Sequence, residues 1–162
     1  MIDLPVTLSW QCAAFSDLSV TQLYAILRAR SDVFVVEQNC LFQDMDGADE
    51  ACRHLTAWIP GAAGPEVAAY LRIVPPELKF AEASLGRVMT SSQARGSGIG
   101  KQLMTRGIEE LQRTYPGAAV RIGAQHYLEK FYQSFGFVTD SQLYLEDDIP
   151  HVDMLKSGAL PA

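Results

Sequence analysis

The stretch Ser91–Lys101, SSQARGSGIGK, decides how the rest of the chain is interpreted. It has glycines at positions 96, 98 and 100, and an amphipathic run, Gln102–Tyr115, follows it directly. Glycines at this spacing let a backbone approach a ligand closely, and the start of a helix presents free N–H groups and the positive end of the helix dipole. Arg95 and Lys101 add positive charge. The stretch therefore predicts an anion-binding loop that joins a strand to a helix.

Two common phosphate-binding motifs are excluded by particular residues of this loop. A Walker A motif, GxxxxGK[ST], would place its first glycine at Arg95 and its magnesium-binding hydroxyl at Gln102. A Rossmann motif, GxGxxG, would place its third glycine at Lys101, and it would occur early in a chain of βαβ units. The loop therefore has the general features of an anion site without matching either nucleotide-binding motif.

The composition limits the number of domains and the kinds of partner that the chain can have. The chain has 162 residues, of which 48% are hydrophobic and 20% are charged, and we expect one globular domain over residues 1–162. Its net charge of −6 argues against a nucleic-acid partner, since phosphate binding needs a basic face. We expect a cytoplasmic protein without a membrane partner, because there is no signal-peptide pattern and no apolar run of membrane-spanning length. Cys12, Cys40 and Cys52 form no even disulfide framework. We also expect no metal, because the spacing of Cys40, Cys52 and His54 fits no zinc site, and we expect small buried thiols instead.

Hydrophobic periodicity and turn residues predict a mixed α/β domain. Ser19 and Gln22 have the spacing of a capping box at the start of a helix, and Gly136 has the position of a left-handed cap at the end of another. A turn over residues 60–65 joins two strands into a hairpin, and residues 43–50 form a loop. The predicted helices run over 20–35, from the glycine loop to about 116, and over 124–135. The predicted strands are 4–10, 53–59, 67–74, 84–90, 118–123, 141–146 and 151–155.

Two motifs resemble signatures of the GCN5-related N-acetyltransferases, the GNAT superfamily. The spacing of Gln93, Gly96 and Gly98 is similar to the family's [Q/R]-x-x-G-x-[G/A] loop. Downstream, Phe131–Phe137, FYQSFGF, is similar to the family's [F/L]-Y-x-x-x-G-F segment. The two motifs occur in the expected order with a predicted helix and strand between them, which is more specific than either motif alone.

One branch of the superfamily, the ElaA-like proteins, resembles this chain more closely. The segments that carry this resemblance are Arg30–Cys40, RSDVFVVEQNC, and Ile149–His151, IPH. The similarity extends from about Leu18 to Leu155. Asp148 departs from it, because glycine is expected before IPH, and this departure puts the local turn geometry in question.

The resemblance implies a GNAT fold, an α+β domain with a mixed central sheet flanked by helices, and an acetyl-CoA-dependent N-acetyltransferase. Acetyl-CoA would be a co-substrate and no metal would be needed, because the amine attacks directly in a ternary complex without an acyl-enzyme. The loop would hold the pyrophosphate, the preceding strand would pair with the pantetheine arm, and the main-chain N–H of Val88 or Met89 would polarise the acetyl carbonyl. The expected coenzyme-binding residues are Val88, Met89, Thr90, Gln93, Arg95, Gly96, Ser97, Gly98, Ile99, Gly100, Lys101 and Phe131.

The resemblance also suggests which residues move protons. Tyr132 would protonate the leaving thiolate, and plain core packing is the alternative for this tyrosine. As proton acceptor, Glu37 ranks first, His151 second and His126 third, and a water chain could replace all three. The acceptor would be a small-molecule or peptide amine, and a homodimer is one possible assembly. The rival function is a non-catalytic acyl-CoA sensor or interaction module.

Two acidic groups bear on the choice of acceptor. One comprises Asp44, Asp46, Asp49 and Glu50, and the other comprises Glu146, Asp147 and Asp148, with Asp153 close by. Two solvated loops are the plainer interpretation. If both groups instead line the mouth of the acceptor site, they favour a cationic amine such as a polyamine or a lysine side chain.

Overall fold

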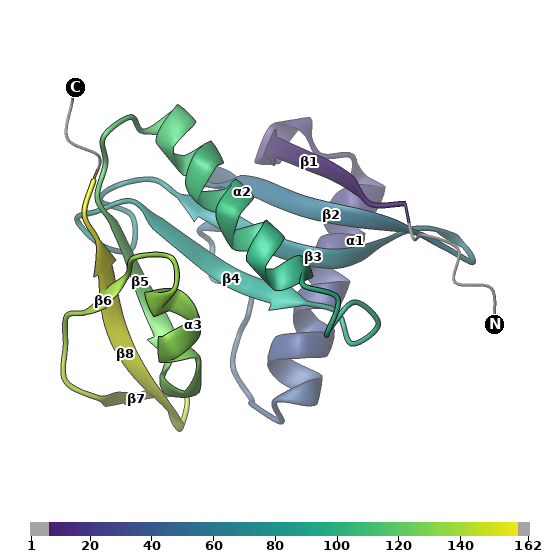
Figure 1. The fold of residues 1–162 in the computed structure, drawn as a ribbon. Coiled ribbons are helices and arrows are strands. Elements are labelled where there is room, and N and C mark those ends of the chain that lie inside the picture. The colour runs from purple at the N-terminus through teal and green to yellow at the C-terminus, as the bar shows by residue number, and fades with distance from the viewer. Residues whose placement is uncertain (1–6, 159–162) are drawn as a thin grey trace.

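The computed structural model of the protein describes residues 7–158, and its larger layer is a four-stranded antiparallel sheet (Figure 1). In spatial order the strands are β1 (Ser9–Ala14), β2 (Arg53–Gly61), β3 (Gly64–Val74) and β4 (Ser84–Thr90). Helix α2 (Ile99–Thr114) covers one face of this sheet, and helix α1 (Val20–Arg30) covers the other.

The second, smaller sheet consists of β5 (Val120–Gln125), β6 (Val138–Thr139), β7 (Tyr144–Glu146) and β8 (Ile149–Lys156). Strand β8 lies between β5 and β6, and β7 pairs with the first residues of β8. Helix α3 (Glu129–Gln133) follows a short 3₁₀ turn, η4 (His126–Leu128), and packs against β5. The combination confirms the predicted mixed α/β domain. No helix within residues 7–158 has the length and apolar character needed to cross a membrane.

The two sheets meet at a single point. Ala83, just before β4, forms a parallel bridge with Val120 at the start of β5, and the N–H of Arg121 donates to the Ala83 carbonyl at 2.9 Å. Among residues 7–158 no ladder continues this pairing, and Figure 1 shows β4 and β5 diverging from it. Since β4 pairs with β3 and β5 pairs with β8, the edges that β4 and β5 turn toward each other are left open.

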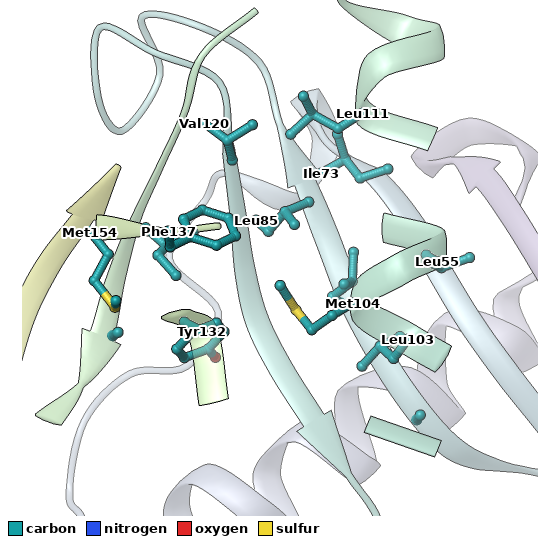
Figure 2. Close-up of a cluster of buried hydrophobic side chains, with 14 of the residues drawn as sticks. Leu55, Ile73, Leu85, Leu103, Met104, Leu111, Val120, Tyr132, Phe137 and Met154 are labelled. Atoms are coloured by element: carbon teal, nitrogen blue, oxygen red, sulfur yellow. The ribbon is translucent and has the colours of Figure 1, made fainter. Parts of the chain in front are cut away.

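The main hydrophobic core lies between the first sheet and α2 and continues beneath the second sheet (Figure 2). Leu71 of β3 and Leu103 and Leu111 of α2 are fully buried. Gly107 allows α2 to approach closely, because a Cβ at this position would lie 2.6 Å from Leu71 Cδ2. A second cluster, beneath α1, fixes the opposite face of β3 and β4 and consists of Ile26, Val33, Trp58, Val67, Tyr70 and Met89.

Several local predictions are confirmed. The hydroxyl of Ser19 accepts a hydrogen bond from the N–H of Gln22 at 3.1 Å, and Oε1 of Gln22 accepts one from the N–H of Ser19 at 3.0 Å, which completes the capping box. Gly136 has a φ of +88°, as a left-handed helix cap requires. The predicted hairpin forms between β2 and β3, and β4 has the predicted bounds.

Several boundary predictions are wrong, and one strand was not predicted. The first strand is Ser9–Ala14 rather than 4–10, and residues 4–6 of that prediction lie outside the described residues. The first α-helix ends at Arg30, after which the chain continues as a π-helix, η2 (Ser31–Glu37). Strand β6 was not predicted, because its two residues are too few to show a periodic pattern.

The turn between β7 and β8 explains the departure at Asp148. Asp147 and Asp148 have φ values of +49° and +62°. Two consecutive left-handed residues are the φ pattern of a type I′ hairpin turn, in which asparagine and glycine are favoured. Asp148 therefore adopts the conformation that glycine would adopt, and the turn is retained at some backbone cost.

A buried charge cluster fastens the loop before β2 to the α1 face of the first sheet. The fully buried guanidinium of Arg30 contacts Asp44 at 2.9 Å and Asp49 at 2.7 Å. Arg72 of β3 contacts Asp46 at 2.6 Å and Asp49 at 2.9 Å. Buried charges are tolerated when they are paired, so these carboxylates are held by arginines rather than by solvent. The interpretation of this acidic group as a solvated loop is therefore wrong for Asp44 and Asp49, whereas Asp46 is an exposed residue whose carboxylate is paired with Arg72.

This cluster predicts a loss of stability in acid. Hydrogen bonds from Arg72 hold the pKa of Asp46 far below its usual value. Burial alone would raise the pKa of Asp49, but contacts with Arg30 and Arg72 outweigh burial and lower it. A carboxylate with a depressed folded-state pKa stabilises the fold above its unfolded pKa of about 4, and this contribution is lost as the pH falls toward the folded value. The free energy of unfolding, measured by chemical denaturation, should therefore fall as the pH drops below about 5.

Asp49→Asn should lower the free energy of unfolding at pH 7 by about 3–5 kcal/mol, because Arg30 and Arg72 lose a charged acceptor. The same change should make the acid dependence less steep. Asp17→Asn, at an exposed position, is the matched control and should alter neither quantity. An acid dependence as steep in Asp49→Asn as in the unmodified protein would contradict this account.

Candidate active site

A cleft of about 1190 Å³ lies between the diverging edges of β4 and β5. Its lining comes from β4, the glycine loop, η2 and the residues after it, α3 with the turn before it, and the β5, β7 and β8 strands. These segments are far apart in the sequence, and the divergence of the two sheets is what brings them around one volume.

A β-bulge shapes the β4 side of this cleft. Between Gly86 and Met89, two β4 residues, Arg87 and Val88, lie opposite a single residue of β3. Arg87 has a left-handed φ of +52°, and a bulge of this kind bends the strand and re-aims the residues that follow it. Val88, Met89 and Thr90 all line the cleft. The open edge of β4 beside them is therefore available to pair with a ligand that contains amide groups.

The glycine loop leads into α2 beyond the end of β4. Gly96 and Gly98 both have φ of +82°, and a Cβ at either position would have no atom within 4 Å, so the two residues leave open space at the start of the helix. Gly98 is the N-cap of α2, and no side chain caps the helix there. The first N–H groups of α2 are therefore available to an anion, and Arg95 and Lys101 line the cleft beside them.

Most of the predicted coenzyme-binding residues line the cleft. Gln93 and Ser97 do not, and the Ser97 hydroxyl donates to the carbonyl of Ala94 at 2.6 Å, within the loop itself. The predicted residues that the structure brings together on the cleft are Val88, Met89, Thr90, Arg95, Gly96, Gly98, Ile99, Gly100, Lys101 and Phe131.

Tyr132 lines the cleft from α3 and is only 6% exposed. Its ring packs edge-on against Phe131 and Phe137, with centroid separations of 5.2 and 6.2 Å, and Figure 2 shows it among the buried side chains. Burial raises the pKa of the Tyr132 hydroxyl, so this group stays protonated at neutral pH. The same side chain thus packs in the core and presents a proton donor to the cleft.

Two of the three candidate proton acceptors, Glu37 and His151, line the cleft. Glu37 ends η2, and its Oε2 lies 2.6 Å from the guanidinium of Arg95. His126 does not line the cleft; its side chain is half exposed and lies 3.5 Å from the Glu129 carboxylate. The structure therefore separates His126 from the other candidates.

His151 has the geometry of a proton acceptor. Its Nδ1 donates to the carbonyl of Ile149 at 2.7 Å, which leaves the lone pair of the neutral ring on Nε2. Nε2 lies 3.5 Å from a carboxylate oxygen of Glu146, which would stabilise the ring after it gains a proton. Tyr144 stacks on the imidazole at 5.9 Å and donates its hydroxyl to Asp153 at 2.7 Å. The backbone sets the tautomer and the tyrosine fixes the ring plane.

Around His151, the sequence indicated Glu146 and Asp153 only as members of an acidic group, and it gave no indication of Tyr144, Gly123 or Gln125. Asp153 and His151 are two positions apart on β8 and share a face, and they pair with Gly123 and Gln125 of β5. A Cβ at Gly123 would lie 3.3 Å from the hydroxyl of Tyr144, so the glycine makes room for that side chain. Strand alternation could have indicated Asp153. The positions of Tyr144 and Gln125 depend on strand pairings for which the sequence contains no local signal.

The two acidic groups differ in their relation to the cleft. Glu146, Asp147 and Asp153 line it and are called the acidic wall below. Of the first group only Asp46 lines the cleft, and its carboxylate already has cationic partners, including Lys79 at 3.0 Å. Within residues 7–158, no three histidine, cysteine, aspartate or glutamate side chains are arranged to hold a metal ion.

Comparisons with known proteins agree with this geometry. The family model described as an acetyltransferase (GNAT) domain matches residues 72–157, which include β4, the glycine loop, Tyr132 and His151. Protein ElaA of Escherichia coli strain K12 is 42% identical over 151 residues, which cover 92% of this chain and 96% of that protein.

Two solved structures extend the comparison to three dimensions. An acyl-CoA N-acyltransferase from Pseudomonas aeruginosa is 40% identical with a TM-score of 0.86, and the match covers 93% of this chain and 100% of that chain. The crystal structure of Escherichia coli ElaA is 41% identical with a TM-score of 0.85, again over 93% of this chain and 100% of that chain.

The open space at Gly98 predicts how this loop responds to substitution. Gly98→Ala should weaken the binding of coenzyme A about tenfold, because a methyl group would occupy the anion site and strain a left-handed residue. Gly47→Ala is the matched control, since Gly47 has a φ of +79°, equally open surroundings and no place on the cleft. Calorimetric titration of both variants measures the difference. Equal affinities would contradict the assignment of the loop.

Proposed function

This chain belongs to the GNAT acetyltransferase family and has the GNAT fold, and we propose that it moves an acetyl group from acetyl-CoA to a primary amine. GNAT acetyltransferases use acyl-CoA, and the similarity to an acyl-CoA N-acyltransferase supports an acyltransferase function. The observation that carries the proposal is the cleft, where the glycine loop, the open β4 edge and Tyr132 line one volume.

The residues of the cleft fit the chemistry of the coenzyme. The N–H groups at the start of α2, together with Lys101, would bind the pyrophosphate. The open edge of β4 would pair with the amides of the pantetheine arm, as an added strand would. The coenzyme supplies an activated thioester, and the main-chain N–H of Val88 or Met89 would donate to its carbonyl oxygen, where negative charge develops during attack.

His151 and Tyr132 would carry out the proton transfers. Amines reach the cleft mainly as ammonium ions, and Nε2 of His151 would accept a proton so that the neutral nitrogen can attack the thioester carbon. As the C–N bond forms and the C–S bond breaks, Tyr132 would donate its proton to sulfur. The remaining excess proton on the nitrogen would leave to solvent, from which Tyr132 is reprotonated. His151 is preferred over Glu37 because the hydrogen bond from its Nδ1 to the Ile149 carbonyl leaves Nε2 free to accept a proton.

The acidic wall favours a cationic acceptor. The three carboxylates of Glu146, Asp147 and Asp153 lie on the same side of the cleft as His151. Negative charge in a concave site raises the local concentration of cations and speeds their encounter with the protein. We therefore propose an amine that carries a further positive charge, such as a polyamine or a lysine-containing peptide.

The release of free thiol from acetyl-CoA across a panel of amines tests the function. Spermidine and lysine peptides should be acetylated faster than amines of equal length with a neutral tail, and the difference should shrink as salt is added. Equal rates for cationic and neutral amines would contradict the proposed acceptor class. Coenzyme binding without thiol release for any amine would instead indicate a non-catalytic acyl-CoA sensor.

Substitution of the proposed proton-transfer residues should separate chemistry from binding. Tyr132→Phe should lower kcat about 100-fold and leave the Kd for coenzyme A unchanged, because the phenyl ring keeps the packing and loses only the donor. His151→Gln should remove the acid limb of the pH–rate profile. An unchanged kcat in Tyr132→Phe would exclude this residue from the mechanism, and an unchanged acid limb in His151→Gln would leave water as the acceptor.

A further inference from the structure

The ion pair between Glu37 and Arg95 connects the two sides of the cleft. The NH2 group of Arg95 lies 2.6 Å from Oε2 of Glu37 and donates to the carbonyl of Thr90 at 3.0 Å. Glu37 belongs to η2, whereas Arg95 belongs to the glycine loop, so the contact joins segments 58 residues apart in the chain. Both residues line the cleft. A cleft-lining acidic residue of η2 therefore holds a cation that lies in the proposed pyrophosphate site.

The backbone around Glu37 supports a functional role for the pair. Glu37 is the last residue of a seven-residue π-helix, and the N–H of Cys40 donates to the carbonyl of Val35 at 3.1 Å, which continues the wide spacing. π-Helical segments are rare and occur frequently at functional sites. The wide turns of η2 bring Glu37 up to the glycine loop. An α-helix of the same length would follow a different path.

The pair is also weak enough to be exchanged. The side chains of Arg95 and Glu37 are 45% and 37% exposed, and ion pairs with this exposure contribute little to stability. A pyrophosphate carries more negative charge than one carboxylate and accepts paired hydrogen bonds from a guanidinium. Once a pyrophosphate reaches the loop, it competes with Glu37 for Arg95 and has the advantage in charge.

We propose that Glu37 is a counter-ion of Arg95 that coenzyme binding displaces, and that the freed carboxylate then binds the acceptor ammonium. This inference rests on the proposed function and adds an order of binding, in which the coenzyme precedes the amine. Before coenzyme binds, Glu37 is committed to Arg95; afterwards its charge is available beside the acceptor. The amine site is therefore completed only after the coenzyme site is filled, and Glu37 is a positioning residue rather than the catalytic base. Because such coupling is reciprocal, Glu37 weakens coenzyme binding in the free protein.

Coenzyme A binding to single and double variants tests this exchange. Glu37→Gln should tighten the Kd for coenzyme A by about two- to fivefold, the upper part of the range expected for loss of an exposed competing ion pair. Arg95→Gln should weaken it, and adding Glu37→Gln to Arg95→Gln should give no further tightening. Glu110→Gln is the matched control, because this substitution removes the same negative charge from another ion pair. Glu110 pairs with Arg113 at 2.5 Å on α2, away from the cleft. Glu110→Gln should leave the Kd unchanged.

Each outcome of this cycle decides the proposal. An unchanged Kd in Glu37→Gln would overturn the proposal. It would also be overturned if Glu37→Gln tightened the Kd equally in the unmodified protein and in Arg95→Gln, because the loss of one negative charge would then explain the effect without Arg95. With the best amine of the panel, Glu37→Gln should raise the KM for amine more than it lowers kcat; the reverse would make Glu37 the base. If the unmodified protein does not bind coenzyme A, the proposed function and this inference fail together. If it binds and Glu37→Gln has no effect, only the inference fails.

Discussion

The parallel pairing of β4 with β5 is limited to one bridge, between Ala83 and Val120, and the rest of the site depends on that limit. Had the ladder continued, the edges of both strands would be satisfied and the two sheets would form one. Because it stops, two open edges face each other around a cleft of about 1190 Å³. Backbone groups at an open edge need partners, and a ligand rich in amides can supply them. The β-bulge at Arg87 bends β4 on the way to the glycine loop.

The side of the cleft formed by the loop before β2 is held by charges rather than by a sheet. Arg30 and Arg72 are buried, and they bind Asp44, Asp46 and Asp49 of the loop before β2. Such a cluster adds little net stability compared with apolar packing, but removing one member is costly because a buried charge loses its partner. In this protein the charge cluster determines where the loop before β2 lies. It fixes a long irregular segment against β3, so that Cys40 and Phe42 of this segment line the cleft.

The sequence predicts those parts of the structure in which the interacting residues lie close together in the chain. The capping box of Ser19 and Gln22 and the left-handed cap at Gly136 involve residues close in the chain, so their spacing is sufficient evidence. The glycine loop and Tyr132 were identified through resemblance as well as through spacing. The contacts of Asp49 and Glu37 could not be predicted, since their partners lie 19 to 58 residues away and no local pattern encodes such a pairing. The ranking of Glu37 as first proton acceptor depended on the absence of that information, because a loop carboxylate looks free until its arginine is known.

The central claim of this account is that the open β4 edge and the glycine loop bind the coenzyme together. Amide hydrogen exchange with and without coenzyme A measures this directly, since exchange slows where a backbone N–H gains a partner or its opening is suppressed. The account predicts slower exchange over residues 88–101, from the end of β4 to the start of α2, and little change in β1 and β2. Slower exchange elsewhere in the chain, with residues 88–101 unaffected, would contradict it.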